Sequence, residues 1–204
     1  MMLDSVFGKD ISTEADYSDV VISLYASLLP DFNSSNHNIS PYSAWSIPPS
    51  KNGLQTVPRT IPKKMIDSGI ILVNDEDYST TITPAGSITG WHYDRCDAGT
   101  VLQMLDGFKL FIVCPPTPNN MRHFSTICRM EVLDQVEKGL HEFEDVRYLV
   151  ARAGDMFVLP VGELHLVISP VNSAVGGWYC VKDEWKSRVV TLKAWEKKMG
   201  WADD

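Results

Sequence analysis

Nine short β-rich segments follow one another between residues 69 and 181, and turn-forming residues such as Asp106-Gly107 separate most of them. Many short strands at this spacing are typical of a β-sandwich or a β-barrel. The fold expected from this pattern is mainly β, with helices at its flanks. We expect strands at 69–74, 79–83, 87–93, 99–105, 108–114, 147–151, 155–160, 164–169 and 174–181.

Helices are expected on both sides of these strands and once between them. Residues 15–29 carry apolar side chains at helical spacing and end at Pro30. A polar passage follows, in which several prolines exclude regular structure as far as Pro62. A helix at 119–139 is expected to interrupt the strands. Residues 184–199 form an amphipathic pattern, and its apolar residues are spaced to pack on the barrel: Trp185, Val189, Leu192 and Trp195.

The length and composition suit a single folded unit. The chain has 204 residues, of which 44% are hydrophobic and 22% charged, an ordinary globular balance that can bury a sizeable core. We therefore divide it into a helical and proline-rich flanking segment at 1–68, packed on the barrel, a barrel at 69–183, and a C-terminal helix at 184–204.

The charge and the cysteines narrow the classes of partner. A net charge of −8 argues against direct nucleic-acid binding and is compatible with a basic peptide partner, although a solvated acidic surface is the simpler explanation. No apolar run approaches the ~18 residues of a membrane-spanning helix, and the start lacks signal-peptide order. We expect an intracellular chain, in the nucleus or cytoplasm.

The four cysteines form no C-x-x-C pair. Cys114 and Cys180 are expected to be buried, whereas Cys96 is a candidate for the mouth of a site.

The sequence His92-Tyr93-Asp94, together with His165 in a later apolar strand, offers two imidazoles and one carboxylate. Side chains at i and i+2 of a strand point to the same face, so His92 and Asp94 can reach one metal ion from one strand. His165 would come from a facing strand. Such a set binds one face of Fe(II) and leaves the other positions open. The alternatives are two structural histidines with a turn aspartate, or a zinc hydrolase site, for which no nucleophile motif is present.

Three stretches carry a resemblance to a known family. They read SITGWHYD at 87–94, LDGFKLFIVCPPT at 105–117 and AGDMFVLPVGELHLVISP at 153–170. Together, in this order and spacing, they resemble the Jumonji C (JmjC) family of Fe(II)/2-oxoglutarate oxygenases, closest to the F-box and PHD-finger-linked lysine demethylases. The resemblance covers residues 69–181. It implies a double-stranded β-helix (a cupin-like jelly roll), Fe(II) held by His92, Asp94 and His165, 2-oxoglutarate as cosubstrate, and O₂.

The same resemblance implies that Thr89, Lys109 and Asn38 contact 2-oxoglutarate. Lys109 opens an apolar run, where an inward-pointing lysine needs an anionic partner such as a dicarboxylate. Thr89 lies three residues before His92 and therefore faces away from it unless the strand bends. The alternatives are a lysine on an exposed strand edge, an ordinary strand threonine, and an asparagine that makes a loop turn.

Four positions depart from the pattern of the demethylase subgroup, namely Leu102, Gln103, Glu163 and Trp178, and they leave the substrate open. We expect oxidation of a protein lysine, in a histone tail for example, by demethylation or by carbon hydroxylation. The chain carries no recognisable reader module, so a separate chromatin-targeting partner is expected. The alternative is a catalytically inactive, cupin-like binding or structural protein.

Overall fold

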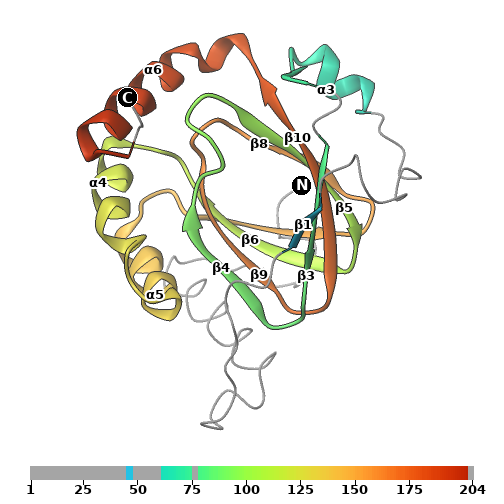
Figure 1. Cartoon of the computed structure of the whole chain (residues 1–204), viewed down its shortest axis with the longest axis horizontal. Coiled ribbons are helices and arrows are strands. Elements are labelled where there is room, and N and C mark those ends of the chain that lie inside the picture. Colours follow the sequence, from blue (N-terminus) through green and yellow to red (C-terminus); the bar gives the residue numbers. More distant parts are fainter. Residues whose placement is uncertain (1–44, 48–60, 75–77, 202–204) are drawn as a thin grey trace, which may run out of the picture.

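The β-rich pattern forms two antiparallel sheets in the computed structural model, which describes residues 45–47, 61–74 and 78–201 (Figure 1). The first sheet has the order β1-β3-β10-β5-β8, and β2 also pairs with β10. Its strands are β1 (Trp45–Ile47), β2 (Ile71–Leu72), β3 (Ser79–Thr83), β5 (Gly99–Asp106), β8 (Met156–Leu159) and β10 (Ser173–Val181). The second sheet has the order β4-β9-β6-β7, and its strands are β4 (Ser87–His92), β6 (Phe108–Cys114), β7 (Arg147–Arg152) and β9 (Leu164–Ser169).

The path of the chain between the sheets defines the fold. From β3 to β6 each strand lies in the opposite sheet from the one before it, and the same alternation runs from β7 to β10. Two mirrored alternations of this kind wind the chain into a double-stranded β-helix. The expected fold class, mainly β with flanking helices and a jelly-roll barrel, is confirmed.

Strands β6 and β9 are almost entirely buried because both of their faces are covered. Alternate residues on them, including Phe111 and Val167, pack with Met104 and Leu159 of the other sheet inside the barrel. The intervening residues belong to a larger cluster outside the barrel, with side chains of the helical layer: Leu110, Ile112, Leu164, Leu166, Ile168, Met121, Phe124 and Ile127. The side-chain period of two therefore separates an inner core from an outer core.

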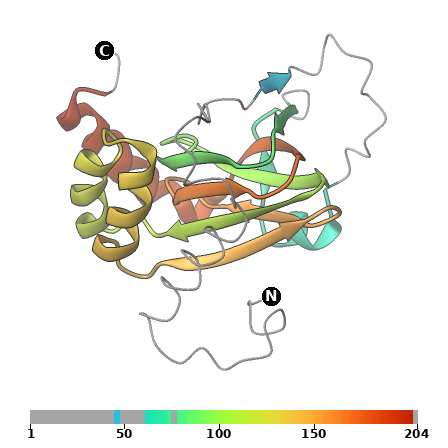
Figure 2. The same ribbon diagram turned by 90° about the horizontal axis from the view of Figure 1, so that it is seen from below.

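The helices gather on one side of the barrel. Helices α4 (Pro118–Ile127), α5 (Val132–Glu142) and α6 (Lys186–Met199) lie next to one another in both views (Figures 1 and 2), whereas α3 (Lys63–Asp67) lies apart from them. Thr117 caps α4, since its hydroxyl accepts from the Asn120 backbone N–H. The short 3-10 turn η1 (Asp183–Trp185) leads into α6, so the helix expected at 184–199 is confirmed.

Three expectations for local structure were wrong in detail. The insertion at 119–139 is two helices, because α4 ends at Ile127 and a turn closed by the Met130 N–H on the Ile127 carbonyl reverses the chain. A single helix over 119–139 would be about 30 Å long and could not fold back on the sheet. The proline-rich passage contains β1, which lies at the edge of its sheet and has β3 as its one partner among the described strands. Prolines beside a strand are tolerated at such an edge. The strand expected at 69–74 is only β2. The helix expected at 15–29 lies outside the described residues, as does most of 1–68.

Trp91 joins helix α5 to strand β4. Its ring is 3% exposed and packs edge-on against Phe143, with ring centroids 4.8 Å apart. Its indole N–H donates to the Gln135 carbonyl at 2.9 Å. Gly139 faces this ring so closely that an added Cβ would lie 2.1 Å from Trp91 Nε1.

Gly139→Ala is therefore expected to destabilise the protein. A glycine-to-alanine change inside a helix ordinarily stabilises by about 1 kcal/mol, whereas overpacking a filled core costs about 1–3 kcal/mol. The second effect should win, because the indole is held on both sides. Urea unfolding of this variant, with the exposed Glu137→Ala on the same helix as control, checks the sign. A more stable Gly139→Ala would mean that the Trp91 contact is loose.

Candidate metal centre and anion pocket

His92 and His165 are direct cross-strand neighbours on β4 and β9. Their ring centroids lie 4.1 Å apart. Each ring holds its Nδ1 against a backbone carbonyl two residues earlier, that of Gly90 at 2.8 Å for His92 and that of Glu163 at 3.0 Å for His165. An Nδ1–H that donates to a carbonyl leaves the lone pair on Nε2, so each ring offers Nε2 to a metal ion.

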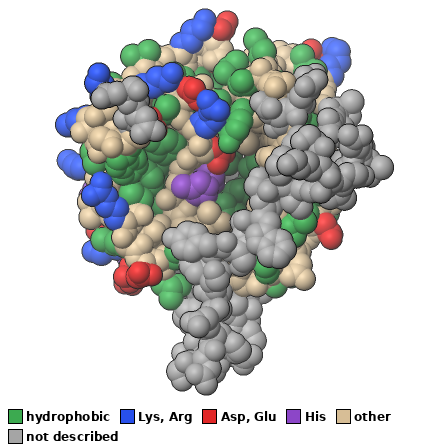
Figure 3. All heavy atoms as spheres, in the orientation of Figure 1, with side chains coloured by type: hydrophobic (Ala, Val, Ile, Leu, Met, Phe, Trp, Pro, Cys, Tyr) green, Lys and Arg blue, Asp and Glu red, His purple; other side chains and the backbone are tan. Residues whose placement is uncertain are grey.

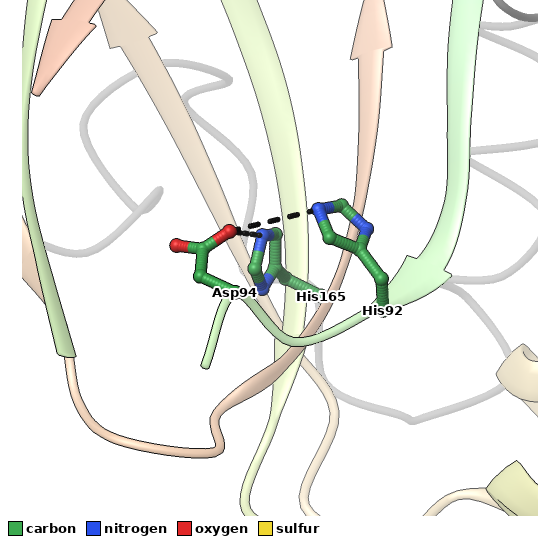
Figure 4. Close-up of side chains that lie close together, drawn as sticks. All are labelled: His92, Asp94 and His165. Carbon is green, nitrogen blue, oxygen red and sulfur yellow. Dashed lines mark ion pairs between the residues drawn. The ribbon is translucent and has the colours of Figure 1, made fainter. Parts of the chain in front are cut away.

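Asp94 completes the set from the loop after β4, so the expectation that it would share a strand with His92 was wrong: β4 ends at His92. Its Oδ1 lies 3.8 Å from His92 Nε2 and 3.6 Å from His165 Nε2 (Figure 4). Thr100 of β5 donates its hydroxyl to the other oxygen, Oδ2, which leaves Oδ1 free for a ligand. The three candidate ligand atoms all lie within 4.8 Å of one another, and no other set of His, Cys, Asp or Glu in the described part of the chain meets this test.

The protonation state of His92 suits metal binding. Burial, and then the neighbouring His165, lower the pKa of His92 to about 4, against the opposing effects of Asp94 and the Gly90 carbonyl. His92 is therefore neutral near pH 7, which is the form that binds metal. Two neutral imidazoles and one carboxylate fit Fe(II) with open positions, and they can also hold Zn²⁺. Figure 3 shows histidine atoms near the centre of one face of the barrel, with an acidic side chain beside them.

A β-bulge brings Thr89 to the same side as His92. Thr89 pairs with Val167, but His92 pairs with His165, so β4 uses one residue more than β9 over this stretch. The extra residue offsets the odd spacing, and both side chains line one cavity of about 280 Å³. The bend in β4 that was needed for Thr89 and His92 to share a face is therefore present.

Lys109 lies inside this cavity, so a position on an exposed strand edge is excluded. Its side chain is 4% exposed, and its ammonium donates to Thr83 Oγ1 at 2.8 Å and to Ser169 Oγ at 2.9 Å. No carboxylate of the described residues forms an ion pair with it, and no charged neighbour contributes to the shift of its pKa. Burial alone lowers the pKa of Lys109 to about 8. A buried cation held only by hydroxyls is a site that an anion would complete.

Other expected residues fall in different places. Leu102 and Trp178 line the cavity, while Gln103 and Glu163 do not. Asn38 lies outside the described residues. Cys96 does not line the cavity either, and burial together with Glu196 raises the pKa of its thiol to about 11, which disfavours the reactive thiolate. Cys114 and Cys180 are buried, as expected.

Four residues of the site have no role in the sequence interpretation: Thr83, Thr100, Gln135 and Ser169. Ser169 follows His165 by four residues in one strand, so the period of two could have placed it on the cavity face. Thr83, Thr100 and Gln135 reach the site from β3, β5 and α5, and no sequence pattern links those elements to the H-x-D motif.

The fold and the site together define a jelly-roll barrel with a candidate His-Asp-His metal centre. Curated proteins of similar sequence point to the same family as the sequence motifs do. The JmjC domain-containing histone demethylation protein 1 of Saccharomyces cerevisiae is 32% identical over 89 residues, covering 44% of this chain and 18% of that protein. The proteins of the same name from Cryptococcus neoformans and Mycosarcoma maydis are each 27% identical, over 92 and 106 residues.

These relatives confirm the resemblance to JmjC-type proteins. The matches span less than a quarter of the length of each relative. A search against models of known families gives no match. Among solved structures, the Drosophila melanogaster CENP-C cupin domain is 10% identical with a TM-score of 0.35, covering 50% of this chain and 59% of that one. None of the described helices combines the length and apolarity needed to cross a membrane.

Proposed function

We propose that this chain is an Fe(II)- and 2-oxoglutarate-dependent oxygenase of the JmjC type that oxidises a protein lysine. One observation supports this most strongly: a single cavity contains a His-Asp-His set at one place and, at another, a buried lysine that has no carboxylate partner among the described residues. Fe(II) and 2-oxoglutarate, when bound, supply the chemistry, in which O₂ oxidises both the cosubstrate and a C–H bond of the substrate.

Metal binding and cosubstrate binding are proposed at two ends of the cavity. His92, Asp94 and His165 would hold the metal, with Thr100 fixing the carboxylate of Asp94. The Lys109 ammonium would meet the distal carboxylate of 2-oxoglutarate, beside the hydroxyls of Thr83 and Ser169, and Thr89 lines the same cavity. Because Lys109 is buried, this ion pair would form away from water, where a charge-assisted contact is strong.

The substrate proposal follows the relatives, which are named for histone demethylation. We favour an N-methylated lysine, and carbon hydroxylation of lysine is the second choice. The net charge of −8 suits a basic peptide such as a histone tail, which would place the chain in the nucleus.

Mass spectrometry of methylated histone peptides incubated with the chain, Fe(II), ascorbate and 2-oxoglutarate tests this proposal. Loss of a methyl group together with succinate indicates demethylation, and gain of one oxygen indicates hydroxylation. Succinate with unchanged peptides would mean uncoupled turnover and would refute these histone lysines as the substrate. No succinate with any peptide would favour a cupin-like binding protein without turnover.

A further inference from the structure

The side chains that alternate with the metal-binding residues point away from the cavity and into the helical layer. Trp91 precedes His92 and contacts α5, while Tyr93 lies between His92 and Asp94 and donates its hydroxyl to Glu196 of α6 at 2.6 Å. The H-x-D loop is therefore held from behind by two helices. The contact with α5 also includes a hydrogen bond to the backbone N–H of Trp91.

Gln135 makes that contact. Its side chain is on the inner face of α5, and the residue is 6% exposed. Its Oε1 accepts from the Trp91 backbone N–H at 2.8 Å, and its Nε2 donates to the Met130 carbonyl at 2.9 Å. The hydrogen bond from Nε2 to the Met130 carbonyl fixes the orientation of the side-chain amide. Its oxygen is thereby held against the Trp91 N–H, which lies within the bulge.

The bulge is the element that puts Thr89 and His92 on one face of β4. The backbone at Gly90 fits the Gln135 amide so tightly that a Cβ added there would lie 2.3 Å from Oε1. An N–H buried without an acceptor is unfavourable, so loss of the amide would favour a strand without the bulge. In such a strand Thr89 and His92 would face opposite sides.

We infer that Gln135 is a positioning residue, which maintains the bulge and so aligns the candidate cosubstrate contact Thr89 with the candidate metal ligand His92. The inference rests on the proposed function of this cavity. The residue acts through the Trp91 N–H and touches neither metal nor cosubstrate.

The test compares Gln135→Met, which keeps the side-chain volume and removes both hydrogen bonds, with the wild-type chain. Outer-shell changes of this kind weaken metal binding by about 10–100-fold. We expect a Co²⁺ affinity about 10-fold lower, a changed visible absorption spectrum of the bound Co²⁺, and a raised KM for 2-oxoglutarate. The control is Leu140→Ala on the same helix, a partly buried position packed on the core, compared by its melting temperature. It should lower stability without changing the Co²⁺ spectrum.

A double-substitution cycle tests whether Gln135 acts on the metal site through the backbone of the bulge. Gly90→Ala should weaken Co²⁺ binding because its methyl group displaces the amide. In the Gln135→Ala background that methyl group has room, so the double variant should bind Co²⁺ as well as Gln135→Ala alone. If the losses of Co²⁺ affinity in the two single variants multiply in the double variant, the two positions act separately and the inference is overturned. A wild-type Co²⁺ spectrum in Gln135→Met would overturn it as well. A wild-type chain that binds no Co²⁺ would instead refute the proposed metal site, and the inference with it.

Discussion

His92→Ala and Asp94→Ala are each expected to abolish Fe(II) binding while the barrel stays folded. Each substitution removes one of three ligand atoms that lie within 4.8 Å of one another. Loss of an outer-shell partner costs about 10–100-fold in metal affinity, so loss of a ligand should cost at least about 100-fold. Neither residue belongs to the buried apolar core, and circular dichroism should be unchanged. Anaerobic Fe(II) or aerobic Co²⁺ titration measures the loss.

The chain offers a matched control. His123 also pairs with a carboxylate, that of Glu142 at 2.8 Å, but it lies in the helical layer and not in the cavity. His123→Ala should therefore bind metal like the wild type. Full metal occupancy in both His92→Ala and Asp94→Ala would contradict the assigned centre.

Lys109→Met is expected to stabilise the ligand-free protein while it removes 2-oxoglutarate binding. Burial lowers the pKa of Lys109 from 10.5 to about 8, and at 1.36 kcal/mol per unit the folded protein bears a cost of about 3 kcal/mol near pH 7. The two hydrogen bonds to Thr83 and Ser169 return about 1 kcal/mol each, the usual net contribution of an intramolecular hydrogen bond. Methionine should therefore gain about 1–2 kcal/mol.

The pH dependence of that gain has a definite sign. Below pH 8 the lysine is charged in both the folded and the unfolded chain, so its full cost is present. Between pH 8 and 10.5 the folded chain loses the proton first, and the cost disappears as the pH rises. Urea unfolding at pH 7 and pH 10 should show the advantage of Lys109→Met at pH 7 and little of it at pH 10.

The exposed Lys138→Met, on helix α5, is the control and should change neither stability nor binding appreciably. A destabilised Lys109→Met would mean that the lysine serves the fold and not an anion. Unchanged binding of 2-oxoglutarate would place the cosubstrate elsewhere.

The sequence predicts the strands well because their side chains alternate between two covered faces. In β6 and β9 the period of two separates cavity residues from residues packed against helices, and the observed bounds of both strands match the expected ranges. The two histidines come together for the same reason. Both lie in strands, and the pairing of His92 with His165 places their rings on one face. Asp94 reaches them from the loop after β4, which strand spacing does not describe.

The sequence does not predict the features that depend on contacts between distant elements. The bulge in β4 is favoured by an amide on α5, and residues 91 and 135 are far apart in the chain. Thr83 of β3 contacts Lys109 of β6 although the two strands belong to different sheets, and no local sequence pattern predicts this contact. The break between α4 and α5 likewise depends on packing of both helices beside the same barrel.

Calorimetric titration of 2-oxoglutarate into the Mn²⁺-loaded chain tests the central claim, that one cavity takes both metal and dicarboxylate. Mn²⁺ binds the same class of ligands without starting the reaction. We expect one binding site per chain, with affinity that falls steeply when Mn²⁺ is omitted and also in Lys109→Met. Binding that is equally tight without metal, or that is unchanged by Lys109→Met, would contradict the account.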